Sequence, residues 1–410
     1  MIYQPPTGAR DLFPLDVAQK IWIETRIQQV FQRWGYHRII TSTLERIDTL
    51  MAGGAIERST VIQVQGMDDE FLGLRPELTA SIARAAATRM ARSTRPQRLY
   101  YNANVFRRSP GQHHNRQHEF YQAGAELLGS SGTVADAEVL LLLADCLTQL
   151  ELNQWCLILG DAGLTRSLLS SFPADIRDAV REAIANLDRI ALDELPLSAE
   201  QRSHALMLLD LRGHPADVLQ RVSSLDLNPD QRAAVNNLKS LVELLADNAE
   251  FAQGDQGASL VLDLSLIRTF DYYTGIVFEV VSASSSGQRV IGQGGRYDQL
   301  LGLYHPNGQS EPGIGFTLDI SELHQLMLPT GLLPSETPAS DWLVVPTTPQ
   351  AYSHAFAYAR KIRTAAALVR AEVYLNDGAD RDTVRLHAQQ RSIRQVAWIG
   401  ADGGVNIETV

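Results

Sequence analysis

The sequence predicts an α+β protein in which strand-forming segments surround a helical insertion and a small α/β unit follows. Strand-like apolar runs lie on both sides of a long helical stretch, which is the first observation behind this prediction. The second is the helical stretch itself, at about residues 164–252, where apolar residues recur three and four positions apart. The third is the alternation of strand and helix patterns after residues 333–340, which we interpret as a linker.

The segment before the insertion combines strands with two helices. Apolar side chains at helical spacing predict a helix over residues 17–34, and Gly35 ends it before a predicted strand at 36–44. A polar loop at residues 107–118, rich in Gly, Pro, His and Asn, separates two further strands. These further elements are strands at 98–103, 119–126 and 155–158 and a helix at 135–150.

Two helix starts are marked inside the insertion. Ser198 is followed by Gln201 three positions later, the pattern of a capping box. Asn228 suits the last residue before a helix, and Pro229 suits the first residue of that helix. Strand patterns return at residues 259–264 and 276–281. Beyond the linker, strands at 342–345, 371–375 and 395–399 alternate with helices at 352–368 and 380–390, which predicts a small parallel α/β unit.

Composition limits the cellular setting and the partners. The chain has 410 residues and a formal net charge of −11, which disfavours nucleic acid as the main partner because phosphate binding requires a basic surface. No apolar run approaches the roughly 20 residues that span a bilayer, and the first residues lack a signal-peptide pattern. Cys146 and Cys156 both lie in apolar stretches, so we expect two reduced thiols and a cytoplasmic location.

Three segments carry side chains suited to binding a small charged ligand. Glu77 and Thr79 form the first, and Gln122 and Glu126 form the second. The period of two along a strand places Gln122 and Glu126 on one face, and carboxylates at 77 and 126 suit a cationic ligand. The third segment holds an arginine that can meet a carboxylate and two tyrosines that can form an aromatic wall: Arg268, Tyr272 and Tyr273. Gly292, Gly294 and Gly295 would let the backbone approach a flat ring.

Each segment also has a purely structural interpretation. Glu77 suits the start of a helix, Arg268 a surface ion pair, and the tyrosine pair an ordinary core. The Gly-x-Gly-Gly pattern alone is a turn as readily as a binding loop. His113, His114 and His118 form a solvated loop rather than a zinc site, because neither cysteines nor a carboxylate cluster accompany them.

Residues 266–275 and 313–322 resemble signature motifs of histidyl-tRNA synthetase, a class II aminoacyl-tRNA synthetase. The resemblance covers residues 8–327 well and implies an antiparallel sheet flanked by helices and a dimer formed through this core. It also implies that Glu77 and Thr79 hold the α-amino group of an amino acid, within a histidine-type pocket completed by Gln122, Glu126, Arg268, Tyr272 and Tyr273. Residues 341–410 resemble a shortened anticodon-binding domain, which we interpret as a structural or interaction remnant.

The chain departs from the family where ATP would bind. Arg107 matches a phosphate-gripping arginine, but Ser109 stands where the family has a glutamate, and Glu322 stands where it has a second phosphate-gripping arginine. One charge pair near 4 Å is worth about 4 kcal/mol at an effective dielectric of 20, so replacing attraction by repulsion costs several powers of ten in ATP affinity. Arg296 is the only nearby arginine that we expect could compensate for Glu322.

A synthetase-like chain with amino-acid motifs kept and ATP motifs changed resembles the regulatory-subunit family of ATP phosphoribosyltransferase. The resemblance implies no catalysis, no cofactor and no metal, a short-form catalytic subunit as partner, and L-histidine as feedback ligand in the first step of histidine biosynthesis. The rival hypotheses are an active histidyl-tRNA synthetase and a tRNA-binding control protein. The expected domains are a core in two parts (1–163 and 257–330), a helical insertion (164–256) and a C-terminal α/β domain (341–410).

Overall fold

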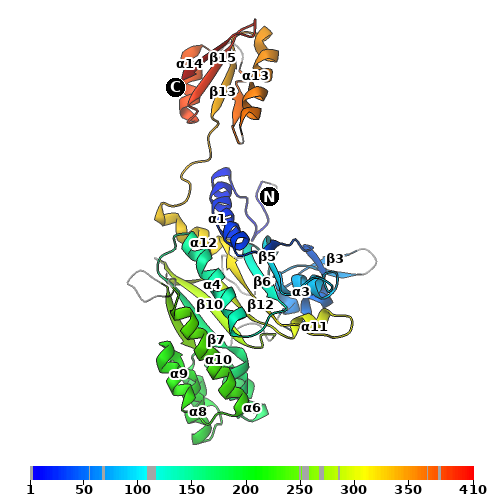
Figure 1. Cartoon of the computed structure of the whole chain (residues 1–410), viewed down its shortest axis with the longest axis vertical. Coiled ribbons are helices and arrows are strands. Elements are labelled where there is room, and N and C mark those ends of the chain that lie inside the picture. The colour runs from blue at the N-terminus through cyan, green and yellow to red at the C-terminus, as the bar shows by residue number, and fades with distance from the viewer. Residues whose placement is uncertain are drawn as a thin grey trace. The chain divides into compact units, whose positions relative to one another are not determined.

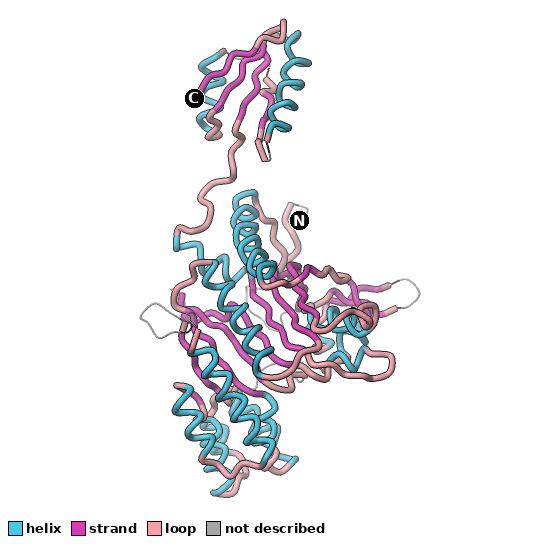
Figure 2. The backbone as a smooth tube through the Cα atoms, viewed as in Figure 1, coloured by secondary structure: helices cyan, strands magenta, loops and turns pink. Residues whose placement is uncertain are grey.

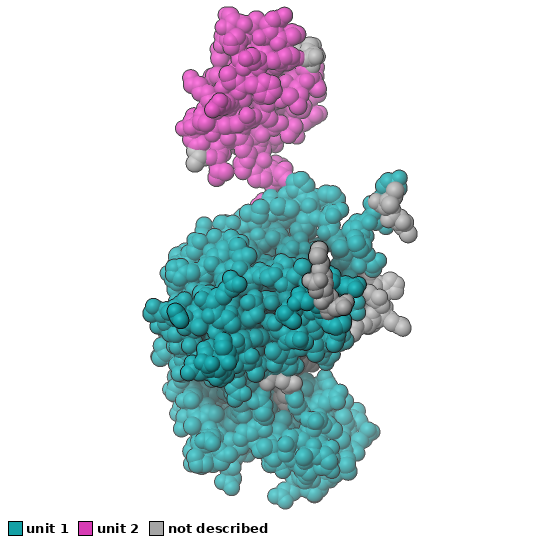
Figure 3. Space-filling view, turned by 90° about the vertical axis from the view of Figure 1, so that its right-hand side faces the viewer, with its two compact units in different colours: residues 1–333 teal, residues 334–410 magenta. Residues whose placement is uncertain are grey.

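The computed structural model describes residues 3–54, 56–66, 70–108, 117–248, 251, 258–266, 272–284, 287–366, 368–376 and 380–410. The chain forms two compact units, Met1–Leu333 and Pro334–Val410, which Figure 3 distinguishes by colour. The finer division of the first unit that the sequence suggests stays a prediction. Across the described ranges, no helix has both the length and the apolar character needed to cross a membrane.

A nine-stranded sheet organises the described part of the first unit (Figure 1). Neighbouring strands are antiparallel except for the pairs β1–β5 and β7–β9, which confirms the antiparallel sheet that the sequence predicts. In spatial order the strands are β1 (His37–Arg38), β5 (Gln97–Phe106), β6 (Glu119–Leu128), β12 (Gly313–Asp319), β11 (Gly287–Arg296), β10 (Ile276–Ser284), β7 (Trp155–Asp161), β9 (Ser259–Asp263) and β8 (Arg212–Gly213).

Three helices pack together over one face of this sheet: α1 (Pro14–Arg33), α4 (Thr133–Gln149) and α12 (Ile320–Met327) (Figures 1 and 2). The apolar stripe of α1, including Ile23, Ile27 and Phe31, is buried there, as its helical spacing predicts. The helix predicted at 17–34 starts earlier, because Pro14 suits a first helical position. Cys146 in α4 is buried, and both it and Cys156 are free thiols.

The opposite face of the sheet carries α3 (Thr79–Ala87) and α11 (Leu300–Tyr304). Their buried residues Ile82 and Leu300 share a core with Leu99 and Tyr101 of β5, whereas Tyr100 joins the core beneath α1. This alternation along β5 follows from the period of two in a strand. The cavity described below lies within the core under α3.

The strand predicted at residues 36–44 is much shorter in the structure. Only His37–Arg38 joins the main sheet, and the chain then enters a separate three-stranded sheet at β2 (Leu44–Arg46). The buried Arg75 guanidinium donates from Nη1 to the carbonyls of Thr41 (2.9 Å) and Ser42 (3.2 Å), so a side chain satisfies these groups in place of a strand ladder. The other elements here are α2 (Ile47–Met51), η1 (Arg58–Thr60), β3 (Ile62–Gln65) and β4 (Phe71–Leu74).

Helices occupy most of the described part of residues 164–252, as the apolar spacing predicts, with one interruption by the two-residue strand β8. Both predicted starts form complete capping boxes, Ser198 with Gln201 and Asn228 with Gln231. The helices are α5 (Ala162–Leu169), α6 (Ala174–Ala185), α7 (Arg189–Glu194), α8 (Ala199–Leu209), α9 (Pro215–Ser223) and α10 (Pro229–Ala246).

The second unit has a four-stranded sheet in the order β14-β13-β15-β16. Strands β13 (Trp342–Pro346), β14 (Ala371–Val373) and β15 (Gln395–Ile399) are parallel, as predicted. Strand β16 (Val405–Thr409) has no counterpart among the predicted strands and pairs antiparallel with β15. Separate apolar clusters join the two faces of the sheet to α13 (Tyr352–Ala365) and α14 (Arg381–Gln390). The short helix η4 (Pro349–Ala351) follows β13, whereas η3 (Leu328–Thr330) belongs to the end of the first unit.

Candidate functional site

Neighbouring strands and the start of α3 bring five of the seven predicted ligand-binding residues to the wall of one small cavity, and Glu126 lies beside it. Gln122 and Glu126 lie on one face of β6, as their spacing predicts, and both side chains are buried. Opposite them on β12 are Asp319 and Gly315. A side chain at position 315 would collide with the Glu126 carboxylate, so only glycine leaves room for it.

Glu126 lies beside the cavity and forms hydrogen bonds with two of its lining residues. Thr79 donates from Oγ1 to its Oε1 at 2.8 Å, and the Tyr297 hydroxyl donates to its Oε2. The pKa of Glu126 is raised to about 8, chiefly by burial and to a smaller extent by the nearby Glu77, while the two hydroxyl donors oppose the shift. The carboxyl group is therefore largely protonated at neutral pH.

Glu77 serves the fold as well as the cavity. Its carboxylate accepts from the backbone N–H groups of Thr79 (2.6 Å) and Ala80 (2.8 Å), so it caps the start of α3. Burial raises the pKa of Glu77, against these hydrogen bonds and the charge of Arg107. Because Glu77 also lines the cavity, the helix-start role and a binding role are compatible.

The tyrosines form one wall of the cavity. The rings of Tyr272 and Tyr273 meet edge to face with centroids 4.9 Å apart, and Tyr297 packs against Tyr272 at 5.9 Å. A side chain at Gly295 would collide with the Tyr273 ring, and one at Gly294 would meet the carbonyl of Gly315. The flat ring for which Gly295 makes room is therefore the chain's own Tyr273.

The cavity is small. Its volume is about 20 Å³, enough for roughly one water molecule, so an amino acid can enter only if the walls separate. The lining residues are Glu77, Thr79, Tyr101, Arg107, Gln122, Tyr272, Tyr273, Gln293, Gly294, Tyr297, Gly315, Phe316 and Thr317. Arg268, the predicted partner of a ligand carboxylate, lies outside the described residues, as do Ser109, His113 and His114.

Sequence reasoning missed Tyr297, the hydroxyl donor to Glu126. The two residues are 171 positions apart, and no spacing pattern links them. The one sequence feature that could have pointed to Tyr297 is its place directly after Gly294, Gly295 and Arg296, because these glycines were predicted to lie against a flat ring. Among the residues that the structure describes, no group of three or more His, Cys, Asp or Glu is arranged to hold a metal ion.

The arginines of the predicted ATP region are engaged with protein groups. Arg107 lines the cavity and donates from Nε to the Pro76 carbonyl at 2.7 Å. Glu322, at the start of α12, forms an ion pair with Arg289 of β11 at 2.6 Å. The side chains of this pair are 38% and 35% exposed, respectively, so solvent weakens their attraction. Arg289 nevertheless offsets part of the repulsion that Glu322 would exert on phosphate.

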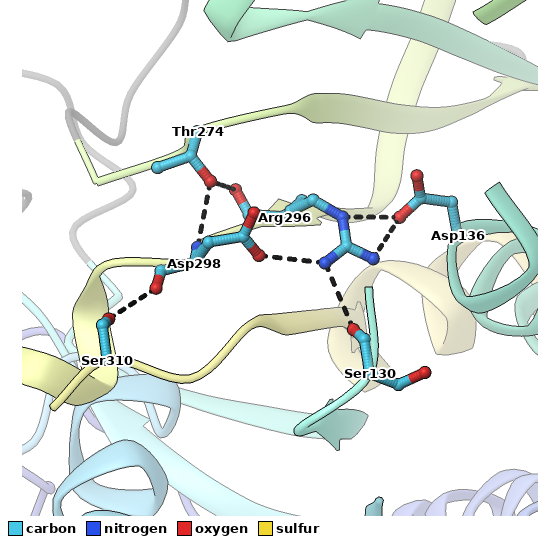
Figure 4. A network of polar contacts seen from close by, with 6 residues as sticks. All are labelled: Ser130, Asp136, Thr274, Arg296, Asp298 and Ser310. Carbon is cyan, nitrogen blue, oxygen red and sulfur yellow. Dashed lines mark hydrogen bonds and ion pairs between the residues drawn. The ribbon is translucent and has the colours of Figure 1, made fainter. Parts of the chain in front are cut away.

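Arg296, the one nearby arginine that the sequence offers as a candidate to compensate for Glu322, pairs with other residues. Arg296 is buried and donates from Nε and Nη2 to Oδ1 of Asp136 at 2.8 and 2.6 Å (Figure 4). Its Nη1 donates to Asp298 at 2.9 Å and to the Ser130 carbonyl at 3.3 Å. A buried guanidinium is costly to desolvate unless its N–H groups find acceptors, and these hydrogen bonds join β11 to the first turn of α4.

Arg289 was not predicted as the partner of Glu322, because the two residues are 33 positions apart and no local sequence pattern links them.

Solved structures share this architecture. A Bacillus halodurans structure described as an ATP phosphoribosyltransferase regulatory subunit/histidyl-tRNA synthetase matches with a TM-score of 0.80 and 26% identity, covering 98% of this chain and 99% of that one. Histidyl-tRNA synthetase from a Nostoc species matches with a TM-score of 0.77 and 18% identity, covering 99% and 97%. The fold is that of the class II aminoacyl-tRNA synthetases of the histidyl type.

Sequence comparison identifies the family to which the chain belongs within this class. A sequence profile described as histidyl-tRNA synthetase matches residues 8–323. Curated proteins named ATP phosphoribosyltransferase regulatory subunit are 63% identical over 410 residues in a Nostoc species and 57% identical over 412 residues in a Cyanothece species, each covering both chains fully. The chain belongs to the family of ATP phosphoribosyltransferase regulatory subunits, within the histidyl-tRNA synthetase group.

Proposed function

We propose that this chain is a non-catalytic regulatory subunit that binds and activates a short-form ATP phosphoribosyltransferase in the cytoplasm. The observation that carries the proposal is its full-length identity of 63% with proteins of that name. Glu322 supports the absence of synthetase activity, because it puts a carboxylate at the start of α12 where phosphate needs a cation, and its ion pair with Arg289 offsets this repulsion only in part. The core is proposed to dimerise as in class II synthetases.

The direct test of activation adds this chain to the purified catalytic subunit and measures phosphoribosyl-ATP formation. Histidine-dependent pyrophosphate exchange by this chain alone separates the proposal from an active histidyl-tRNA synthetase. We expect activation in the first assay and no exchange in the second. Exchange without activation would identify a synthetase, and a salt-sensitive tRNA complex without either would identify a tRNA-binding protein.

The cavity around Glu126 is proposed to hold L-histidine as the feedback signal. An ammonium group between the Glu77 and Glu126 carboxylates would favour their ionised forms and replace the proton that burial retains on Glu126. Arg268 is proposed to meet the ligand carboxylate, and the tyrosines to separate and enclose the imidazole. The competing hypothesis is that histidine binds at the interface with the catalytic subunit.

Glu126→Gln tests the pocket while nearly preserving its shape. Loss of a hydrogen bond to a charged group costs about 1.5–3 kcal/mol, so we expect histidine affinity to fall by roughly 10- to 150-fold in calorimetry. Glu200→Gln on the exposed surface of α8 is the matched control and should bind like the original chain. Unchanged affinity in the Glu126 variant would exclude this cavity as the histidine site.

A further inference from the structure

The second unit has an open sheet edge at β16. One side of this strand pairs with β15 over its whole length, from Val405 opposite Ile399 to Thr409 opposite Gln395. No strand in the described part of the chain pairs with the other side. An edge of this kind presents unpaired main-chain donors and acceptors, which are a template for another strand.

The hydrogen-bond register shows which main-chain groups face outward. The Val410 N–H donates to the Arg394 carbonyl at 3.0 Å, and the Gly400 N–H donates to the Gly404 carbonyl at 2.8 Å. Hydrogen-bonded pairs alternate along an antiparallel ladder, so Asn406 and Glu408 turn their backbone groups toward β15. Val405, Ile407 and Thr409 therefore turn theirs outward.

The side chains of β16 do not protect this edge. Val405 and Ile407 are 42% and 52% exposed, and the strand has no lysine, arginine or proline. Natural edge strands usually carry such residues to prevent pairing. The one charged residue, Glu408, is held by Arg385 (2.5 Å) and by the Trp398 indole N–H (3.0 Å), so it does not project a free charge across the edge.

We propose that β16 pairs antiparallel with β16 of a second copy of this chain, centred on Ile407. In this register Ile407 lies opposite the partner's Ile407, and Val405 lies opposite the partner's Thr409. Every outward N–H then meets an outward C=O. On the other face Asn406 lies opposite the partner's Glu408, so no like charges meet. The strand is self-complementary, as a two-fold interface requires.

The test captures the two paired β16 strands of two full-length chains as a covalent dimer. A five-residue edge buries less than a standard protein interface, so the pairing should be reversible and is best captured covalently. Directly opposed, hydrogen-bonded residues have Cα atoms about 5.5 Å apart, which a disulfide can bridge. Under mild oxidation we expect Ile407→Cys to form a covalent dimer roughly tenfold faster than a control cysteine, because pairing raises the local thiol concentration.

Leu386→Cys on α14 is the matched control, with 55% exposure against 52% for Ile407. The unaltered chain measures the background from Cys146 and Cys156. Adding Thr409→Pro to Ile407→Cys removes one outward N–H and leaves the ladder to β15 complete, so it should reduce cross-linking to the control rate. Equal rates for the two cysteine variants, or no effect of the proline, would overturn the proposal.

Discussion

Glu126 retains a proton that an exposed glutamate would release well below neutral pH. Its pKa is raised from 4.5 to about 8, chiefly by burial. At pH below 4.5 the folded and unfolded chains both bind this proton. As the pH rises from 4.5 to 8, the unfolded chain releases the proton that the folded chain keeps. The free energy of unfolding should therefore fall by up to about 1.4 kcal/mol per pH unit across this window.

Urea denaturation at several pH values between 5 and 8.5 checks this residue-scale prediction. We expect the slope to flatten in Glu126→Gln, because glutamine does not titrate, and to persist in Glu200→Gln, whose carboxylate is exposed. The Glu126 variant should gain stability relative to the original chain as the pH rises. Parallel curves for all three proteins would show that Glu126 does not retain its proton in the folded chain.

At the scale of elements, the capping box of α10 gives a quantitative prediction. The Asn228 side chain accepts from the Gln231 N–H at 2.8 Å, and the Gln231 side chain accepts from the Asn228 N–H at 2.9 Å. Asn228→Ala should lower the free energy of unfolding by about 1 kcal/mol in urea titrations. Asn236→Ala, on the exposed side of the same helix, should be neutral or slightly stabilising. A loss in both variants would mean that capping is not the cause.

Elements whose signals are local could be predicted from the sequence, and contacts between distant segments could not. The helices of the insertion follow from apolar spacing and from caps whose two members are only three positions apart. The strand predicted at 36–44 failed because Arg75, far along the chain, binds its carbonyls. The same limit explains the candidate site. The spacing of Gln122 and Glu126 placed both on one face, but neither the Tyr297 hydroxyl nor the Arg289 partner of Glu322 has a sequence pattern.

The whole molecule combines a synthetase core with a site that is closed and acidic. Glu77 lines a cavity of about 20 Å³ and Glu126 is buried beside it, so an amino acid could enter only if the walls of the cavity separate. If histidine binds there as proposed, it would favour a widened cavity over the narrow one, and such a difference in affinity between two states is what feedback requires. Regulation by histidine would then follow from coupling between this cavity and the surface that binds the catalytic subunit.

The regulatory role is tested by phosphoribosyl-ATP formation by the catalytic subunit, measured with and without this chain and across a histidine titration. We expect the rate to rise strongly when the chain is added and histidine to suppress this rise. With Glu126→Gln, the rise should persist while suppression requires roughly 10- to 150-fold more histidine. A rate that is the same with and without the chain would contradict the regulatory role.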